Sequence, residues 1–236
     1  MQKESKSTVR SRLFILDLDR CLLNNHIYVL FDEVVANLAF VDAHLLRQAR
    51  YEREVSGGSF DSIRWLQEQD GFGEQEHSQL VHEFIKKAHS MDADSFLSPG
   101  ARSLLDVCES LEIPHVIMTY GGRENQIAKI RAARLDTTPY IIVDRKQKAE
   151  YITEWWNEAQ GQFEVTIEGK TYQGETAILV DDKATAFDNL PVTPRARGYW
   201  LQAAHLLPSQ QGIVPSNVSI VHGFDEIMTA EKLLTP

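Results

Sequence analysis

The chain has 236 residues, of which 43% are hydrophobic and 25% are charged, and its 24 Lys and Arg residues against 34 Asp and Glu residues give a formal net charge of −10. This length and balance are typical of one or two globular domains and exclude an intrinsically disordered chain. The acidic excess argues against nucleic acid as a partner, because nucleic-acid binding needs clustered Lys and Arg. It does not exclude a small anionic substrate, since a metal ion or a helix N-terminus sets the local field.

The apolar segments are too short for a membrane protein. The longest, such as residues 13–16 and 177–180, have the length of strands, whereas a membrane span needs roughly 18–20 apolar residues. The first twelve residues are polar and no apolar segment of a secretory signal follows them, so we expect no membrane and a cytoplasmic location. The two cysteines, Cys21 and Cys108, are too few for a disulfide scaffold and predict buried thiols.

Short apolar runs that stop at polar residues predict strands of a parallel sheet. Four of them cover residues 13–16, 115–118, 140–143 and 177–180, and two later strands are expected at 198–201 and 218–222. Helical patterns cover residues 101–111, 124–135, 149–160 and 224–234. Strands that alternate with helices predict an α/β fold with a doubly wound parallel sheet.

Residues 24–97 have a different pattern, because they contain almost no strand-like run. Their periodicity predicts helices over 29–49, 59–69 and 75–90. A helical block of this length is too long for an ordinary crossover between two strands. We therefore expect an α/β core of residues 1–23 and 98–236, with residues 24–97 inserted as a helical cap. The alternation over residues 163–171 predicts a small β-hairpin.

Acidic residues stand at the ends of two predicted strands, where an α/β sheet binds its ligands. Asp17 is placed to attack phosphorus as a carboxylate nucleophile, and Asp19 to act as general acid and then base at the leaving-group oxygen. Asp181 and Asp182 complete an oxygen-only site for Mg²⁺, which is bound by carboxylates and substrate phosphate.

Donors for a phosphate group follow the other strands. Thr119 supplies a hydroxyl, and Lys148 or its neighbour Lys146 supplies a positive charge. Gly121 either offers a free backbone N–H to an oxyanion or serves only the turn after the strand. Together with the aspartates, these residues predict a phosphoryl-transfer site.

The four motifs resemble, in order, those of the haloacid dehalogenase (HAD) superfamily of phosphohydrolases. They are LFILDLDRC, VIMTYGG, the lysine of RKQKAEYI and AILVDDKATAFDN, and residues 24–97 fall where one branch of that family inserts a helical cap. The resemblance implies Asp17 as nucleophile and Asp19 as acid and base. It also implies that the side chains of Asp17 and Asp182 and the main-chain carbonyl of Asp19 hold Mg²⁺.

The sequence departs from the family pattern at several positions. Arg20 stands where the family has a small residue, and it is expected to pair with a carboxylate, contact substrate or face solvent. Lys148 is the preferred phosphate-binding lysine because it begins a predicted helix. Arg123 is expected to be exposed rather than to face substrate. Asp188 lies where some relatives carry a further acid, and the alternative is that it caps or flanks the helix after the fourth strand.

The predicted function is a Mg²⁺-dependent phosphatase that cleaves a small phosphorylated metabolite through an aspartyl-phosphate. The alternatives are a phosphomutase or a C–P hydrolase on the same scaffold, and a non-catalytic binding or regulatory protein.

Overall fold

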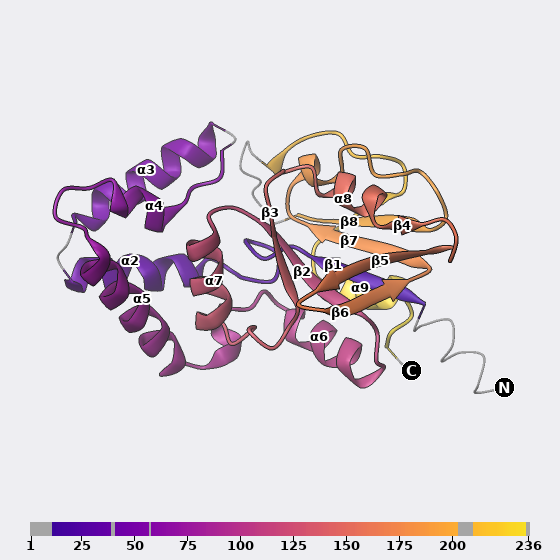
Figure 1. Ribbon diagram of the computed structural model, residues 1–236, viewed down its shortest axis with the longest axis horizontal. Helices are drawn as coiled ribbons and strands as arrows, with labels where there is room; N and C mark the ends of the chain where they lie inside the picture. The colour runs from indigo at the N-terminus through magenta and orange to yellow at the C-terminus, as the bar shows by residue number, and fades with distance from the viewer. Residues whose placement is uncertain (1–10, 39–40, 57, 203–209, 235–236) are drawn as a thin grey trace.

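The core of the molecule is a six-stranded parallel sheet in the order β3-β2-β1-β7-β8-β9 (Figure 1). The computed structural model describes residues 11–38, 41–56, 58–202 and 210–234. The predicted α/β fold with a parallel sheet is confirmed, and each of the six expected strands is present. Their bounds are β1 Arg12–Leu16, β2 His115–Tyr120, β3 Tyr140–Val143, β7 Thr176–Asp181, β8 Ala196–Leu201 and β9 Val218–Val221.

Both faces of the sheet are covered, which explains why its strands are apolar throughout. Phe14 and Leu16 of β1 point into one apolar layer, and Leu13 and Ile15 point into the other. The first layer includes side chains of three helices within residues 101–230 and of helices within residues 26–89, and the second includes side chains of a helix and a 3₁₀ turn. The three helices of the first layer are α6 Ala101–Ser110, α7 Arg123–Ala132 and α9 Phe224–Ala230, and the elements of the second are α8 Lys148–Glu154 and η2 Ala184–Phe187.

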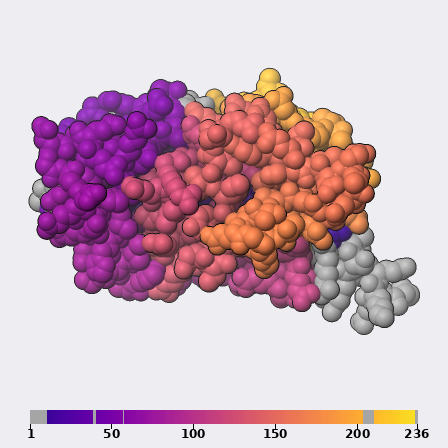
Figure 2. Space-filling model, in the orientation of Figure 1, coloured from indigo at the N-terminus to yellow at the C-terminus, as the bar shows by residue number. Residues whose placement is uncertain are grey.

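A helical insertion, residues 26–96, separates β1 from α6. It forms a lobe at the left of the molecule in Figure 1, and the space-filling view shows it in contact with the rest of the chain (Figure 2). Its helices α4 and α5 pack against α7 of the core, so α7 lies between the insertion and the sheet. The elements of the insertion are α2 His26–Leu38, α3 Ala43–Val55, α4 Ser62–Gln67, α5 Glu74–His89 and η1 Ala93–Phe96.

Three helix predictions are wrong in extent, and one of them, the helix predicted over 224–234, is too long because α9 ends at Ala230. The single helix predicted over residues 29–49 is two helices, because Asp42 accepts a hydrogen bond from the His44 backbone N–H and begins α3 as its N-cap. The helix predicted over 149–160 ends at Glu154, because the next residues form the short strand β4, Trp156–Asn157, which pairs with β5, Gln162–Ile167. The predicted hairpin is confirmed as β5 and β6, Lys170–Gly174, and with β4 it forms a three-stranded antiparallel sheet.

Other expectations from composition concern the thiols, the membrane and the first residues. Cys21 and Cys108 are free and buried, as expected. Among the residues that the structure describes, no helix combines the length and the apolar character that a bilayer crossing requires. The expectation that the first twelve residues contain no secretory signal falls mainly on residues 1–10, which lie outside the described residues.

Candidate active site

Three aspartates meet at the carboxyl ends of two neighbouring strands. Asp17 follows β1, Asp181 is the last residue of β7, and Asp182 comes next. The parallel pairing of Leu16 with Val180 places Asp17 level with Asp181. All three side chains are buried, and each offers a carboxylate oxygen within 4.8 Å of the others. Such a cluster of oxygen ligands suits a hard divalent cation.

The three aspartates differ in how many of their carboxylate oxygens already accept hydrogen bonds. Both oxygens of Asp181 are occupied, Oδ2 by Lys148 Nζ at 2.6 Å and Oδ1 by the backbone N–H two residues on at 2.9 Å. Lys148 also donates to Oδ1 of Asp17. Oδ2 of Asp182 accepts from Gln210, whereas its Oδ1 is buried without a partner among the described residues. A metal ion would satisfy that oxygen, so the three aspartates fit a divalent cation such as Mg²⁺, with an oxygen of Asp182 available and both oxygens of Asp181 already bonded.

Burial and mutual repulsion raise the pKa values of these carboxyl groups. Burial is the main reason why the pKa of Asp17 lies well above its usual range; Lys148 opposes this shift, and Asp181 and Asp182 add to it. Burial and the charge of Asp181 raise the pKa of Asp182 to about 6. Carboxyl groups with raised pKa values release protons when a divalent cation binds, because the cation stabilises their ionised form.

The end of β2 carries the two predicted phosphate contacts Thr119 and Gly121. Thr119 is 1% exposed, and its Oγ1 is buried with no partner in the part of the chain that the structure describes. Its hydroxyl is therefore a donor available to a ligand. Gly121 has a φ of 149°, and a Cβ at this position would lie 2.5 Å from Nε2 of Gln126. The turn thus requires glycine, while the phosphate contacts themselves stay predictions.

The structure places the two candidate lysines differently. Lys148 begins α8, as predicted, and its ammonium group lies between Asp17 and Asp181. Burial opposes the charged form, but these two carboxylates outweigh it and raise the pKa of Lys148 above its usual range. Lys146 shares with Lys148 the lining of a small cavity beside Asp17, and its Nζ lies 6.0 Å from the ring centre of Tyr120.

Asp19 is held by three side chains that come from two different helices. Lys129 Nζ of α7 donates to both of its oxygens, at 2.5 and 2.7 Å, and Gln126 Nε2 donates at 2.9 Å. The Tyr28 hydroxyl of α2 donates at 2.7 Å. Burial alone would raise the pKa of Asp19, but the Lys129 charge and these hydrogen bonds hold it well below its usual range. Asp19 is therefore an ionised carboxylate in this structure.

Among comparisons with known proteins, only the comparison with solved structures finds similar chains. Scans against protein-family models and against curated proteins return no match. A candidate haloacid dehalogenase-like hydrolase from Burkholderia xenovorans LB400 aligns with a TM-score of 0.59 at 16% identity, over 92% of this chain and 97% of that one. This chain has the haloacid dehalogenase-like fold. CbbY from Rhodobacter sphaeroides, in complex with xylulose-(1,5)-bisphosphate, aligns with a TM-score of 0.52 at 16% identity, over 92% and 95%. A candidate β-phosphoglucomutase from Thermotoga maritima aligns with a TM-score of 0.51 at 14% identity, over 95% and 100%.

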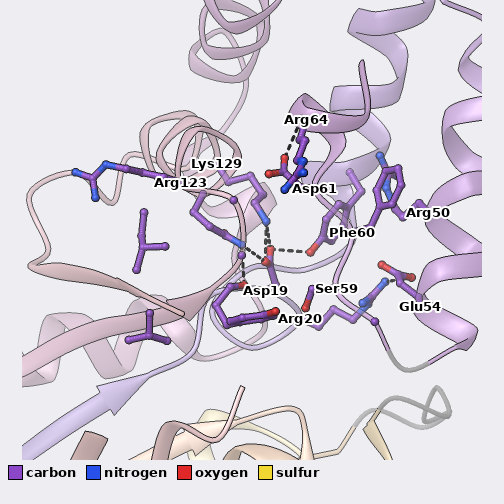
Figure 3. A pocket seen from close by; sticks show the side chains of 18 of the residues that line it. Asp19, Arg20, Arg50, Glu54, Ser59, Phe60, Asp61, Arg64, Arg123 and Lys129 are labelled. Carbon is purple, nitrogen blue, oxygen red and sulfur yellow. Dashed lines mark hydrogen bonds and ion pairs between the residues drawn. The ribbon is translucent and has the colours of Figure 1, made fainter. Parts of the chain in front are cut away.

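Within this HAD-like fold, a cavity of about 480 Å³ lies between the helical insertion and the core (Figure 3). We call it the chamber. Asp19, Tyr120 and Lys183 line both the chamber and the small cavity beside Asp17, so they connect the two spaces. The insertion contributes side chains of α2 and α3 and of the segment leading into α4, and the core contributes the turn after β2 and the buried side of α7.

Three other residues considered in the sequence, Arg20, Arg123 and Asp188, lie outside the aspartate group. Arg20, with a φ of 59°, pairs with Glu54 of α3 at 2.7 Å, so of the expected alternatives it takes the pairing with a carboxylate. Arg123 is exposed, as expected, at the start of α7 and at the chamber wall. Asp188 ends η2 and is not part of the aspartate group at β1 and β7.

The residues that hold Asp19 are not evident from the sequence. Gln126 and Lys129 are three residues apart and therefore share one side of α7, which is the only local sign of their common contact. Tyr28 lies in an amphipathic helix, where an aromatic residue is expected to be an ordinary core residue. Only the folded chain shows that these three meet at one carboxylate.

Proposed function

We propose that the protein is a Mg²⁺-dependent phosphatase that cleaves a small phosphate monoester through an aspartyl-phosphate on Asp17. The observation that carries this proposal is the buried aspartate group together with two buried polar atoms that have no partner among the described residues, Oδ1 of Asp182 within the group and Oγ1 of Thr119 on the neighbouring strand. One suits a metal ion and the other a phosphoryl oxygen. The structural likeness to HAD-like proteins agrees with this assignment.

Asp17 and Asp182, together with the main-chain carbonyl of Asp19, would hold the cation. When bound, Mg²⁺ supplies the positive charge that allows an anionic phosphate to approach an anionic nucleophile. Lys148 holds one oxygen of Asp17 and leaves the other free of protein partners among the described residues. Thr119 donates its hydroxyl to a phosphoryl oxygen, and the turn at Gly121 offers its backbone.

In the first step, an oxygen of Asp17 forms a bond to phosphorus, and the bond between phosphorus and the ester oxygen breaks. The leaving oxygen takes a proton from Asp19. Asp19 is ionised in the free protein, so we propose that a substrate phosphate that is still protonated, as it is below a pKa of about 6, passes its proton through Asp19 to the leaving oxygen.

In the second step, water attacks the phosphorus of the aspartyl-phosphate and gives its proton to Asp19. The bond between phosphorus and Asp17 breaks, which releases phosphate and restores the carboxylate. In this step Asp19 acts from its ionised form, which the hydrogen bonds from Lys129, Gln126 and Tyr28 stabilise and orient.

We further propose that residues 24–97 act as a cap over a core of residues 1–23 and 98–236. The chamber between them has the volume of a site for a small molecule. Closing it excludes water while the aspartyl-phosphate forms, and opening it admits the water for the second step.

The test is turnover of p-nitrophenyl phosphate and of a panel of phosphorylated metabolites, with Mg²⁺ and with EDTA. The wild-type protein should release phosphate only with Mg²⁺, and Asp17→Asn should lose at least about 10⁴-fold in kcat. Acid-quenched wild-type protein should carry a phosphoryl group that neutral hydroxylamine removes, and Asp17→Asn should carry none. Asp136→Asn, at an exposed position, is the matched control and should behave as wild type.

Absence of turnover over the whole panel would overturn the proposal in favour of a binding protein. A phosphorylated product that keeps its phosphate at a new position would move the assignment to a phosphomutase. Full activity of Asp17→Asn would remove Asp17 as the nucleophile.

A further inference from the structure

Asp19 and Lys129 form an ion pair at the chamber wall, and the Asp19 carboxylate accepts further hydrogen bonds from neighbouring side chains. Lys129 is 4% exposed and donates to both oxygens of Asp19, while Gln126 and Tyr28 each donate to one (Figure 3). Four hydrogen bonds from three side chains fix the carboxylate in one orientation. All four residues line the chamber.

The position of Asp19 needs such a restraint because other carboxylates and a cation site are close by. Asp19 lines the small cavity together with Asp17 and Asp181, and its charge adds to the repulsion that raises the pKa of Asp17. A divalent cation bound there would attract any free carboxylate within reach. The side chain of Asp19 nevertheless stands outside the aspartate group that could share one ion.

Stability alone does not explain a buried lysine at this place. Removing an ammonium group and a carboxylate from water costs more than a well-packed apolar pair of similar size. Ala128 and Ile130, the neighbours of Lys129 in α7, are buried in the apolar core, so the packing of this helix does not require a charge at position 129. The charge therefore serves the carboxylate that it contacts.

We propose that Lys129 is a positioning residue that holds the Asp19 carboxylate on the chamber side, away from the metal ligands Asp17 and Asp182. This inference rests on the proposed function for the identity of the metal site and the role of Asp19. Without Lys129, the side chain of Asp19 turns to the cation as an additional ligand. The metal then binds more tightly, and Asp19 no longer reaches the leaving-group oxygen.

The test compares Lys129→Met with wild type by calorimetric titration with Mg²⁺ alone and by steady-state kinetics on an alkyl phosphate. Because affinity for such cations rises with the number of carboxylate ligands, Lys129→Met should bind Mg²⁺ about tenfold more tightly. Its kcat should fall about 10²-fold with little change in KM, since an acid or base step is lost. Lys129→Arg, which retains the charge, should restore the wild-type Mg²⁺ affinity and much of kcat.

Arg131→Met is the matched control, because it removes one positive charge from an exposed position of the same helix. It should leave Mg²⁺ affinity and kcat unchanged. If circular dichroism shows that Lys129→Met does not fold, Lys129→Leu, which also removes the charge and the donor, takes its place with the same expectation.

A folded Lys129 variant with wild-type or weaker Mg²⁺ affinity would overturn the inference, whatever its activity. Failure of the proposed function is a separate result, because there the wild-type protein itself turns over no phosphate ester. The calorimetric comparison needs no turnover and therefore tests the position of Asp19 in either case.

Discussion

Replacing Lys148 by Met removes the only side chain that donates to both Asp17 and Asp181 among the described residues. Lys148 is 3% exposed, and the two carboxylates are 5% and 1% exposed, so solvent cannot replace the ammonium group. The variant keeps the volume of the side chain and loses its charge. It leaves three neighbouring buried carboxyl groups without this cation.

The expected cost follows from the burial of this ion pair. Removing one partner of a buried pair destabilises a protein by about 3–5 kcal/mol, because the remaining charge is left uncompensated. The carboxyl groups reduce the cost by taking up protons, since loss of Lys148 raises their pKa values further. An acid whose pKa is higher in the folded than in the unfolded state stabilises at low pH and loses this stabilisation as pH rises through the folded value. The loss of unfolding free energy in Lys148→Met should therefore be small near pH 5 and reach about 3–5 kcal/mol near pH 8.

The assay is urea unfolding of wild type and Lys148→Met at pH 5, 6.5 and 8, with EDTA and with Mg²⁺. Saturating Mg²⁺ should recover part of the loss, by about 2.7 kcal/mol at one hundred times the dissociation constant. Lys86→Met, at an exposed surface ion pair, is the control and should change the free energy of unfolding by less than about 1 kcal/mol. A loss below about 1 kcal/mol at pH 8 in EDTA, or a loss independent of pH, would refute the reasoning.

Three further predictions concern other contacts. Burial and Asp181 raise the pKa of Asp182 to about 6, so Mg²⁺ affinity in calorimetric titrations should rise as the pH passes through about 6, with proton release on binding. Equal affinity at pH 5 and 7.5 would contradict this. Asp32→Ala, which leaves the Arg50 guanidinium buried without its bidentate partner, should lower the free energy of unfolding by about 3–5 kcal/mol, whereas the double variant Asp32→Leu with Arg50→Met should lose much less. Gly122→Ala places a Cβ 1.5 Å from Oδ2 of Asp61, the N-cap residue of α4. Chemical denaturation should therefore show that the free energy of unfolding falls by about 1 kcal/mol or more, and an unchanged midpoint would exclude the contact.

Much of the sheet could be predicted because buried parallel strands are apolar on both faces and stop at polar residues. The strand expected at 140–143 has the observed bounds, and the one expected at 13–16 differs by a single residue. Helix ends were harder to predict. The break before α3 depends on one capping residue, Asp42, and the end of α8 depends on pairing between β4 and β5.

The candidate site divides in the same way. The amino-acid sequence by itself determined which residues stand at strand ends, and the register of a parallel sheet brings Asp17, Asp181 and Asp182 together there. Only the tertiary structure decided what surrounds Asp19. Its partners Gln126 and Lys129 are 107 and 110 residues away along the chain, and they reach it because α7 lies between the sheet and the helical insertion. Local patterns report which face of an element is apolar, but contacts across such separations depend on how whole elements pack.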